Sequence, residues 1–125
     1  MKHLIRLQKK RVNFTFNPHL LPTFRGILST IYVKPKKNIS ISKLRKTLIK
    51  FYKKNNFIKI LKPNTFLSTN DVINTNYCYI SVCKSKYKNK IIVLSAIDNL
   101  IKGGTGQAIQ NLNIFFNFNK KMGLI

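Results

Sequence analysis

The apolar positions of this chain change several times between the period of a strand and the period of a helix. Val12, Phe14 and Phe16 alternate with polar residues, and this alternation predicts a half-buried strand. Residues 27–33 are nearly all apolar or β-branched, which predicts a second strand that is buried on both faces. Shorter apolar runs predict strands at residues 57–61, 77–83 and 90–97, and the last two flank a segment that predicts a hairpin with a basic tip.

The first helical pattern follows a break at residues 35–38. Four apolar residues fall on one helical stripe: Leu44, Leu48, Phe51 and Tyr52. Lysines occupy the other faces, so the pattern predicts an amphipathic helix that lies on a sheet. Either Ser40 or Ser42 can cap its beginning, because a serine hydroxyl can accept a hydrogen bond from a first-turn N–H group.

A glycine-rich turn, Gly103-Gly104-Thr105-Gly106, joins the strand at 90–97 to a second predicted helix that runs to about residue 118. One face of this helix carries four apolar residues: Ala108, Leu112, Phe115 and Phe116. A strand, a glycine-rich turn and a helix can aim backbone N–H groups at an anion. The same arrangement also packs a helix tightly on a sheet, and the spacing alone leaves both interpretations open.

Helices and strands do not alternate strictly, and adjacent strands are joined by a hairpin. This order predicts an α+β fold with a mixed or mostly antiparallel sheet and helices packed on it. The length of 125 residues and the hydrophobic content of 44% predict one domain over residues 12–125, after a basic segment at 1–11. No apolar run approaches the ~20 residues of a membrane span, and we find no secretory signal. We therefore predict a cytoplasmic protein without a membrane partner.

The charge balance is extreme, with 24 Lys and Arg residues against two acidic ones and a net charge of +22. Such a surface can bind nucleic acid non-specifically through phosphate contacts. Codon bias is the favoured explanation, because Lys, Asn, Ile and Phe dominate the chain and all have A/T-rich codons. The lysines are also spread along the whole sequence, and dedicated nucleic-acid readers usually use more arginine.

Candidate chemistry is sparse. Cys78 and Cys83 lie five positions apart in one predicted strand, so they point to opposite faces and cannot share a metal or a disulfide there. The two histidines add no ligand spacing, so we predict no metal site. Asp71 and Asp98 are the only acids, and neither a Walker loop nor a complete dinucleotide fingerprint is present. The residues alone predict no catalytic group and no self-sufficient enzyme.

Three blocks of this sequence resemble the N-acetyl-gamma-glutamyl-phosphate reductase family. They are FNPHLLPTFRGILSTIYV at 16–33, STNDVINTNYC at 68–78 and AIDNLIKGGTGQAIQNLN at 96–113. The blocks occur in the family's order with matching gaps and cover nearly everything from Val12 onward. The resemblance implies the fold of the C-terminal domain of glyceraldehyde-3-phosphate and aspartate-semialdehyde dehydrogenases.

The resemblance also implies an oxidoreductase of arginine biosynthesis. The family reduces N-acetyl-glutamyl phosphate to the semialdehyde with NADPH, through a thioester on a cysteine. NADP binds mainly on a Rossmann domain, which is absent from this chain together with the family's nucleophile. We therefore expect a homo-oligomeric part of a truncated or split enzyme, inactive without a separate Rossmann and cysteine half. The alternatives are a basic RNA- or ribosome-binding module and a non-functional remnant.

The resemblance implies few site residues in this chain. Arg25 fits the family's Pro-x-x-Arg-Gly pattern, and its guanidinium could bind the substrate's carboxylate or acyl phosphate. The alternative for Arg25 is an ordinary surface arginine. Four residues lie where the family's chain approaches the nicotinamide end of NADP, with helix packing as their alternative: Asn99, Lys102, Gly103 and Gln107.

Overall fold

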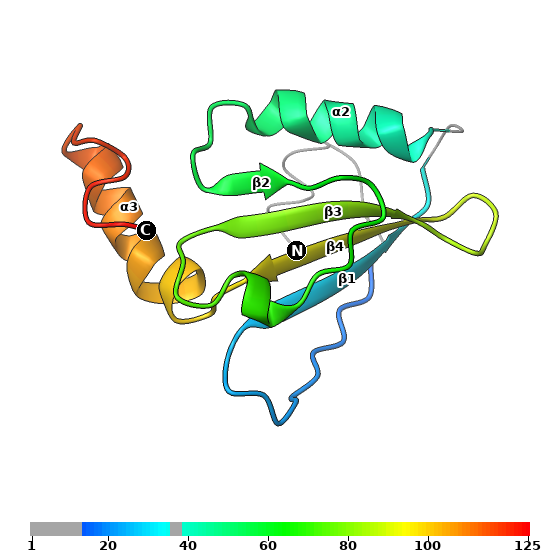
Figure 1. Cartoon of the computed structure of the whole chain (residues 1–125), viewed down its shortest axis with the longest axis horizontal. Coiled ribbons are helices and arrows are strands. Elements are labelled where there is room, and N and C mark those ends of the chain that lie inside the picture. The colour runs from blue at the N-terminus through cyan, green and yellow to red at the C-terminus, as the bar shows by residue number, and fades with distance from the viewer. Residues whose placement is uncertain (1–13, 36–38) are drawn as a thin grey trace.

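The computed structural model describes residues 14–35 and 39–125, which form an α+β unit around one four-stranded sheet (Figure 1). The strands are β1 (Ile27–Val33), β2 (Ile58–Ile60), β3 (Cys78–Lys84) and β4 (Ile91–Ile97), in the order β1-β4-β3-β2. β4 pairs antiparallel with both β1 and β3, whereas β2 pairs parallel with β3. The sheet is therefore mixed, and the predicted α+β class is confirmed.

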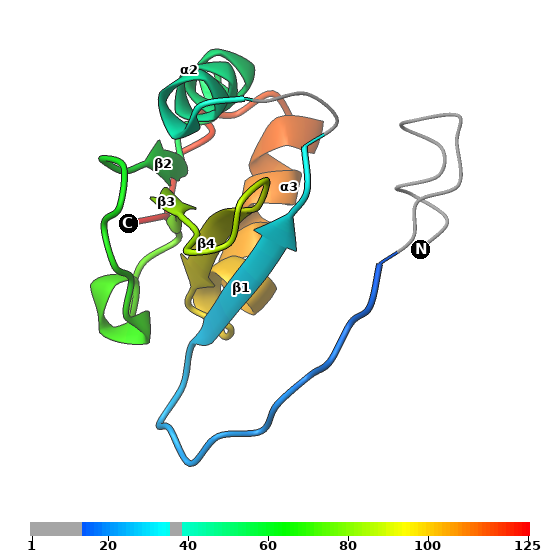
Figure 2. The same cartoon turned by 90° about the vertical axis from the view of Figure 1, so that its right-hand side faces the viewer.

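The four strands between residues 27 and 97 lie where the sequence predicts them, but the earlier strand does not form in the described residues. Val12 lies outside the described part of the chain. Phe14 and Phe16 belong to an extended loop, residues 14–26, and 76% of the Phe16 surface is exposed. Figure 2 shows this loop running away from the sheet. The prediction of a half-buried strand is wrong here, because the loop lies beside no strand with which it could pair.

The predicted burial of β1 on both faces is also wrong. Among the described residues, β1 lies at an edge of the sheet and pairs only with β4. Its four largest apolar side chains are exposed: Ile27, Leu28, Ile31 and Tyr32. The composition of β1 resembles that of a buried strand, but the described residues do not cover it.

Helix α2 (Ile41–Tyr52) packs against β2 and β3, as predicted for an amphipathic helix. Ser40 is its N-cap, and the Ser40 hydroxyl accepts a hydrogen bond from the backbone N–H of Lys43 at 3.2 Å. Leu44, Leu48 and Tyr52 are half-buried. Phe51 is exposed, so the predicted stripe is wrong at that position.

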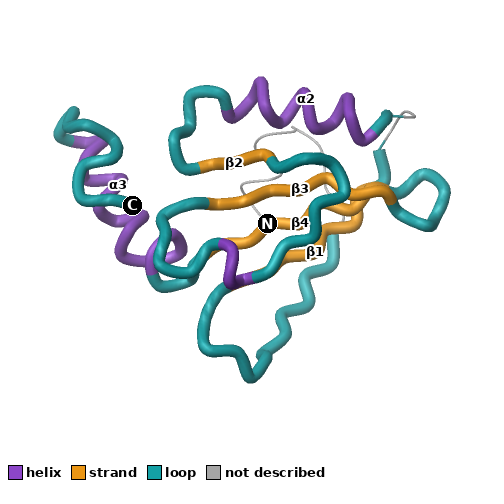
Figure 3. Tube along the Cα trace, in the orientation of Figure 1, coloured by secondary structure: helices purple, strands orange, loops and turns teal. Residues whose placement is uncertain are grey.

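One face of the sheet is covered by residues 62–75, which we call the covering segment. This segment follows β2 in the chain and precedes β3. It crosses one face of the sheet and includes the short 3₁₀ helix η1 (Thr69–Asp71), as Figure 3 shows. Leu67 and Val72 from the segment pack on Ala96 of β4, with Tyr79 and Leu94 at the border of the cluster. The sequence of this segment has no strong helical or strand period, so it does not reveal that the segment supplies the core.

The chain leaves β4 through the π-helical turn η2 (Ile101–Thr105) and enters α3 (Gly106–Phe115). The helix ends three residues earlier than the predicted limit at 118. Its predicted apolar face is exposed, and its buried residues are Gly106 and Asn113. The prediction that this face packs on the sheet is wrong, because α3 lies at the end of the sheet (Figure 1).

None of the helices in the described ranges is long and apolar enough to cross a membrane.

Candidate functional site

The candidate site is organised around Asp98, which directly follows β4 and is fully buried. One carboxylate oxygen, Oδ1, accepts hydrogen bonds from the backbone N–H groups of Leu100 (2.9 Å) and Ile101 (3.1 Å). The other oxygen, Oδ2, accepts one from the backbone N–H of Asn74 at 2.8 Å. A short acidic side chain of this kind can bond to the backbone that follows it, and here it also joins β4 to the covering segment.

Arg25 reaches the same carboxylate from the loop before β1. Its Nη2 lies 2.7 Å from Asp98 Oδ2 and also donates to the side-chain oxygen of Asn74. The Arg25 side chain is only 15% exposed, although its loop is otherwise open to solvent. The ion pair therefore connects three segments that are far apart in the sequence.

Gly26 allows this loop to lie against the rest of the site. Its φ of +108° is a conformation that side chains disfavour. A Cβ at Gly26 would lie 2.5 Å from the Cβ of Thr69 in η1. The Gly26 N–H donates to the side-chain oxygen of Asn99 at 2.8 Å, so the loop is held on two sides.

The electrostatics of the site keep Asp98 ionised. Burial raises the pKa of a carboxyl group, because it removes water from the charged form. The three backbone N–H groups and the Arg25 guanidinium outweigh this effect, so the pKa of Asp98 lies below its ordinary value. At neutral pH the site therefore contains a buried carboxylate and a partly buried guanidinium.

The structure brings three of the five predicted site residues together. Arg25 and Asn99 lie in the network around Asp98, and the Gly103 N–H donates to the backbone carbonyl of Asp98 at 2.9 Å. The other two predicted residues form separate contacts. Lys102 Nζ donates to the Gln110 side-chain oxygen at 2.8 Å, and Gln107 Nε2 donates to that of Asn111 at 2.9 Å.

The contact of Lys102 extends into a second buried cluster beside the start of β3. The oxygen of Gln110 also accepts a hydrogen bond from Nδ2 of Asn76, which is fully buried. Burial lowers the pKa of Lys102, and a Coulomb interaction with Cys78 partly opposes this shift. The cluster holds Lys102 against α3 and against the ring of Phe57, whose centre lies 5.5 Å from Nζ.

These contacts limit how the chain could bind NADP. The Gly103 N–H is bonded within the chain, and Lys102 Nζ and Gln107 Nε2 each donate one hydrogen bond to a neighbouring side chain. Gly103 and Gly104 are exposed at the surface of η2, next to the Asn99 amide. The backbone of this turn is therefore accessible at the surface.

Sequence reasoning does not single out Asp98, Asn74 or Asn76 as site residues. Asp98 has a detectable signal, because it is one of only two acids and directly follows a buried strand. Asn74 has a positive φ of 64°, which asparagine tolerates, but the neighbouring residues in the sequence do not predict this backbone conformation. Asn76 is recognisable only from its contacts.

The fold defines a class of protein that includes solved dehydrogenases. Aspartate semialdehyde dehydrogenase II from Vibrio cholerae superposes with a TM-score of 0.61 and 17% identity over 78% of this chain and 29% of that one. The aspartate semialdehyde dehydrogenase from Francisella tularensis gives 0.59 and 18%, over 76% and 27% of the two chains. At these identities the likeness shows the fold alone.

The sequence comparison identifies the family. The model of the semialdehyde dehydrogenase dimerisation domain matches residues 1–99, and the chain belongs to this family. It is 50% identical over 117 residues to the N-acetyl-gamma-glutamyl-phosphate reductase of Halothermothrix orenii, and 46% identical over 123 residues to that of Clostridium kluyveri. These alignments cover 94% and 98% of this chain but only 33% and 36% of the relatives. The chain thus spans about a third of their length, and the resemblance inferred from the sequence is confirmed.

Proposed function

We propose that this chain is the substrate-binding and dimerisation part of an N-acetyl-gamma-glutamyl-phosphate reductase, an oxidoreductase of arginine biosynthesis. The observation that carries the proposal is the identity of 46–50% to such reductases over almost the whole chain. The NADP-binding Rossmann domain and the nucleophilic cysteine would come from residues outside these 125. Without them the chain would be inactive, because it would lack the nucleophile and the domain that holds the hydride donor.

In this proposal Arg25 binds the substrate's carboxylate or its acyl phosphate. The contacts of Arg25 with Asp98 and with Asn74 both use the same guanidinium nitrogen, Nη2. The other terminal nitrogen of the guanidinium fork would then bind the oxygen atoms of the substrate. Asp98 acts as a positioning residue, because its buried carboxylate fixes the direction of the fork.

The residues of η2 would contact the nicotinamide end of NADP. When bound, NADPH supplies the hydride that reduces the acyl group to the aldehyde. The exposed Gly103 and the Asn99 amide would orient that end of the cofactor. Lys102 and Gln107 would support the turn through their contacts with α3.

We also propose that two copies associate through the open face of β1 and β4. This face carries Ile27, Ile31, Val93 and Ile97, which are in register across the two strands. Ile27 and Ile31 are nearly half exposed, which is unusual for neighbouring isoleucines in a sheet. The description of the family as a dimerisation domain supports association between copies, and the exposure of these isoleucines is the reason for choosing this surface.

The reductase proposal can be tested by complementation. This chain is mixed with the two thirds of the Halothermothrix orenii reductase that it does not match, and NADPH formation is followed from the semialdehyde, NADP and phosphate. We expect activity in the mixture and none from either part alone. The remaining third of the H. orenii enzyme serves as the positive control. If that third restores activity and this chain does not, the proposal is wrong.

Arg25→Lys then tests the site in the active mixture. Lysine keeps the charge for Asp98 but loses the planar fork, so we expect activity to fall about tenfold or more while the chain stays folded. Arg45→Lys is the matched control. Arg45 lies on α2, donates a hydrogen bond to the carbonyl of Leu61 and does not contact Asp98. Its replacement by lysine should therefore leave the activity nearly unchanged. If the two variants lower the activity equally, Arg25 does not bind the substrate.

A further inference from the structure

The charges of this molecule are separated along its sheet. Both acidic residues of the sequence lie at the end of the sheet where β4 finishes: Asp98 follows Ile97, and Asp71 belongs to η1, which lies against Gly26. The hairpin between β3 and β4 lies at the other end, about 20 Å away along a seven-residue strand. The positive charge of the hairpin is therefore not neutralised by any carboxylate side chain of the chain.

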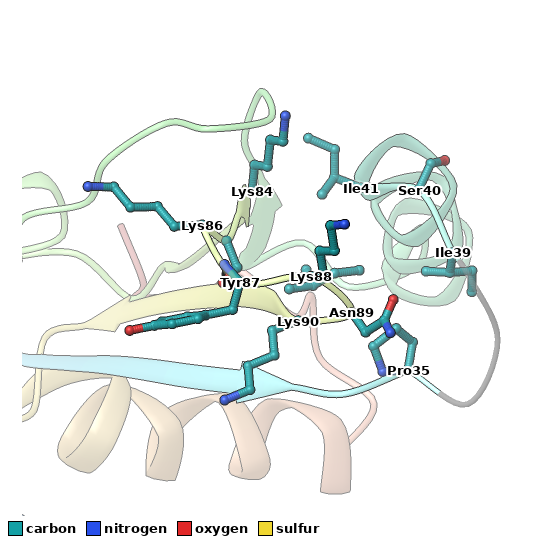
Figure 4. A pocket seen from close by; sticks show the side chains of 12 residues that line it. Pro35, Ile39, Ser40, Ile41, Lys84, Lys86, Tyr87, Lys88, Asn89 and Lys90 are labelled. Atoms are coloured by element: carbon teal, nitrogen blue, oxygen red, sulfur yellow. Dashed lines mark hydrogen bonds between the residues drawn. The ribbon is translucent and has the colours of Figure 1, made fainter.

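The hairpin tip, residues 84–90, concentrates lysine. It contains Lys84, Lys86, Lys88 and Lys90, and all four are exposed. Figure 4 shows them leaving the tip in different directions, with Lys84 and Lys88 toward the side where α2 begins and Lys90 toward the opposite side. Together with the start of α2 they line an open hollow. The N-terminal end of α2 carries a partial positive charge and has no acid in its first turn, so it adds to the same field.

An aromatic ring lies among these lysines. Tyr87 is 69% exposed, and Lys90 Nζ lies 5.2 Å from the centre of its ring. An exposed aromatic side chain between cations is the combination with which proteins bind single strands, since bases stack on the ring and phosphates contact the lysines. The hairpin itself is fixed, because β3 and β4 pair over their full length below it.

We propose that the hairpin tip binds single-stranded nucleic acid, with the four lysines on the phosphates and Tyr87 on a base. The proposal is independent of the reductase function, because the tip lies at the opposite end of β4 from Asp98. A small anion would not need cations that point in several directions around the tip. A membrane surface would favour a fully exposed apolar anchor beside the lysines, whereas Ile39 and Ile41 in the hollow are half-buried and the tip itself offers only Tyr87.

The test compares two variants of the full chain that lose the same charge. In the hairpin variant, Lys84, Lys86, Lys88 and Lys90 are changed to Gln. In the control, Lys46 and Lys50 of α2 and Lys53 and Lys54 just after it, all exposed and away from the start of the helix, are changed to Gln, which has a similar helix propensity. Binding of a labelled single-stranded RNA is measured by fluorescence anisotropy over a range of salt concentrations, and circular dichroism confirms that both variants fold.

We expect the hairpin variant to bind about tenfold or more weakly at about 0.1 M salt, with a salt slope smaller by about 3 in log–log units. The control should bind within about threefold of the parent, since it keeps every contact residue. Equal losses in both variants would overturn the proposal, because attraction would then depend on net charge alone. Absence of RNA binding by the parent chain would overturn it as well.

A second variant isolates the aromatic contact. Tyr87→Leu should weaken binding of the RNA several-fold and leave binding of inorganic polyphosphate unchanged, because polyphosphate has no base to stack. An equal effect on both ligands would overturn the role of the ring. Vesicles of anionic phospholipid provide the last comparison. If they capture the parent chain through the hairpin lysines and RNA does not, a lipid surface replaces nucleic acid as the ligand.

Discussion

The two faces of the sheet are completed in different ways. On one face, the covering segment places Leu67 and Val72 on Ala96, and Val72 and Ala96 are fully buried. On the other face, α2 covers β2 and β3, while Ile27 and Ile31 of β1 remain open to solvent. Figure 2 shows η1 on one side of the sheet and α2 and α3 toward the other. The first face carries a core made by this chain, although Leu28 and Tyr32 at its β1 edge are exposed, and the second face carries the open surface that we propose for association.

The two faces should therefore contribute to different properties: one to the folding stability of the single chain, and the other to association between chains. Substitutions under the covering segment should change the free energy of unfolding of the chain itself. Substitutions on the open face of β1 and β4 should leave that free energy almost unchanged and alter association. The following variants test this division at equal protein concentration, because association also stabilises a folded chain.

Asp98→Asn should have the largest effect. It removes the charge that pairs with Arg25 and one acceptor at a fully buried position, so we expect a loss of about 2–4 kcal/mol in the free energy of unfolding. Urea denaturation followed by circular dichroism measures the loss. Asp71→Asn is the control, since Asp71 is exposed and caps only η1. Comparable losses in the two variants would show that Asp98 does not hold the covering segment.

Val72→Ala should cost about 2 kcal/mol, because it leaves a cavity between the covering segment and β4. Phe66→Ala removes a larger apolar side chain from the same segment, but Phe66 is 87% exposed. We expect the Phe66 variant to unfold at nearly the parent's urea midpoint. If Phe66→Ala lowers the urea midpoint more than Val72→Ala does, the core does not lie between Val72 and β4.

Ile31→Asp should cost less than about 1 kcal/mol in the isolated chain, because Ile31 is nearly half exposed. It should nevertheless convert a dimer into a monomer in sedimentation velocity. Ile49→Asp makes the same change at an exposed position on α2 and should leave the dimer intact. A dimer that survives Ile31→Asp would exclude the open face as the interface.

The pH dependence should give the smallest effect. The folded chain holds the pKa of Asp98 below its ordinary value, so the unfolded chain takes up the proton first as the pH falls. The stabilisation is complete above about pH 5 and decreases below about pH 4, toward the lowered pKa of the folded state. The stability difference between the parent and Asp98→Asn should shrink over this range. A constant difference between pH 3 and pH 7 would show that the ionised carboxylate contributes nothing.

The sequence predicts the elements that depend on local pattern and neighbouring strands. The strands at residues 27–33 and 90–97, the hairpin between β3 and β4, and the Ser40 cap all follow from residue types at short range. The apolar composition of β1 and of α3 is also real, but the sequence does not indicate which body covers these residues. Predictions of burial therefore fail at Ile31 and at Phe115, where the cover is not part of the described residues.

The candidate site shows the same limit. Arg25, Asn99 and Gly103 come together around Asp98, although the resemblance assigns Arg25 to the substrate and the other two to the cofactor. Asp98 itself escapes notice, because its importance comes from three backbone donors and an arginine that sequence spacing does not reveal. The roles of Arg25, Asn99, Lys102, Gly103 and Gln107 in binding ligands remain predictions.

The large net positive charge of the chain affects its behaviour in solution. Two copies of a chain with net charge +22 repel each other strongly, and this repulsion opposes contact between exposed apolar faces. Added salt screens the repulsion, so self-association should tighten with ionic strength, whereas attachment of a polyanion to the hairpin should loosen. A dilute, low-salt solution would thus keep the unpaired β1 edges apart and delay their aggregation.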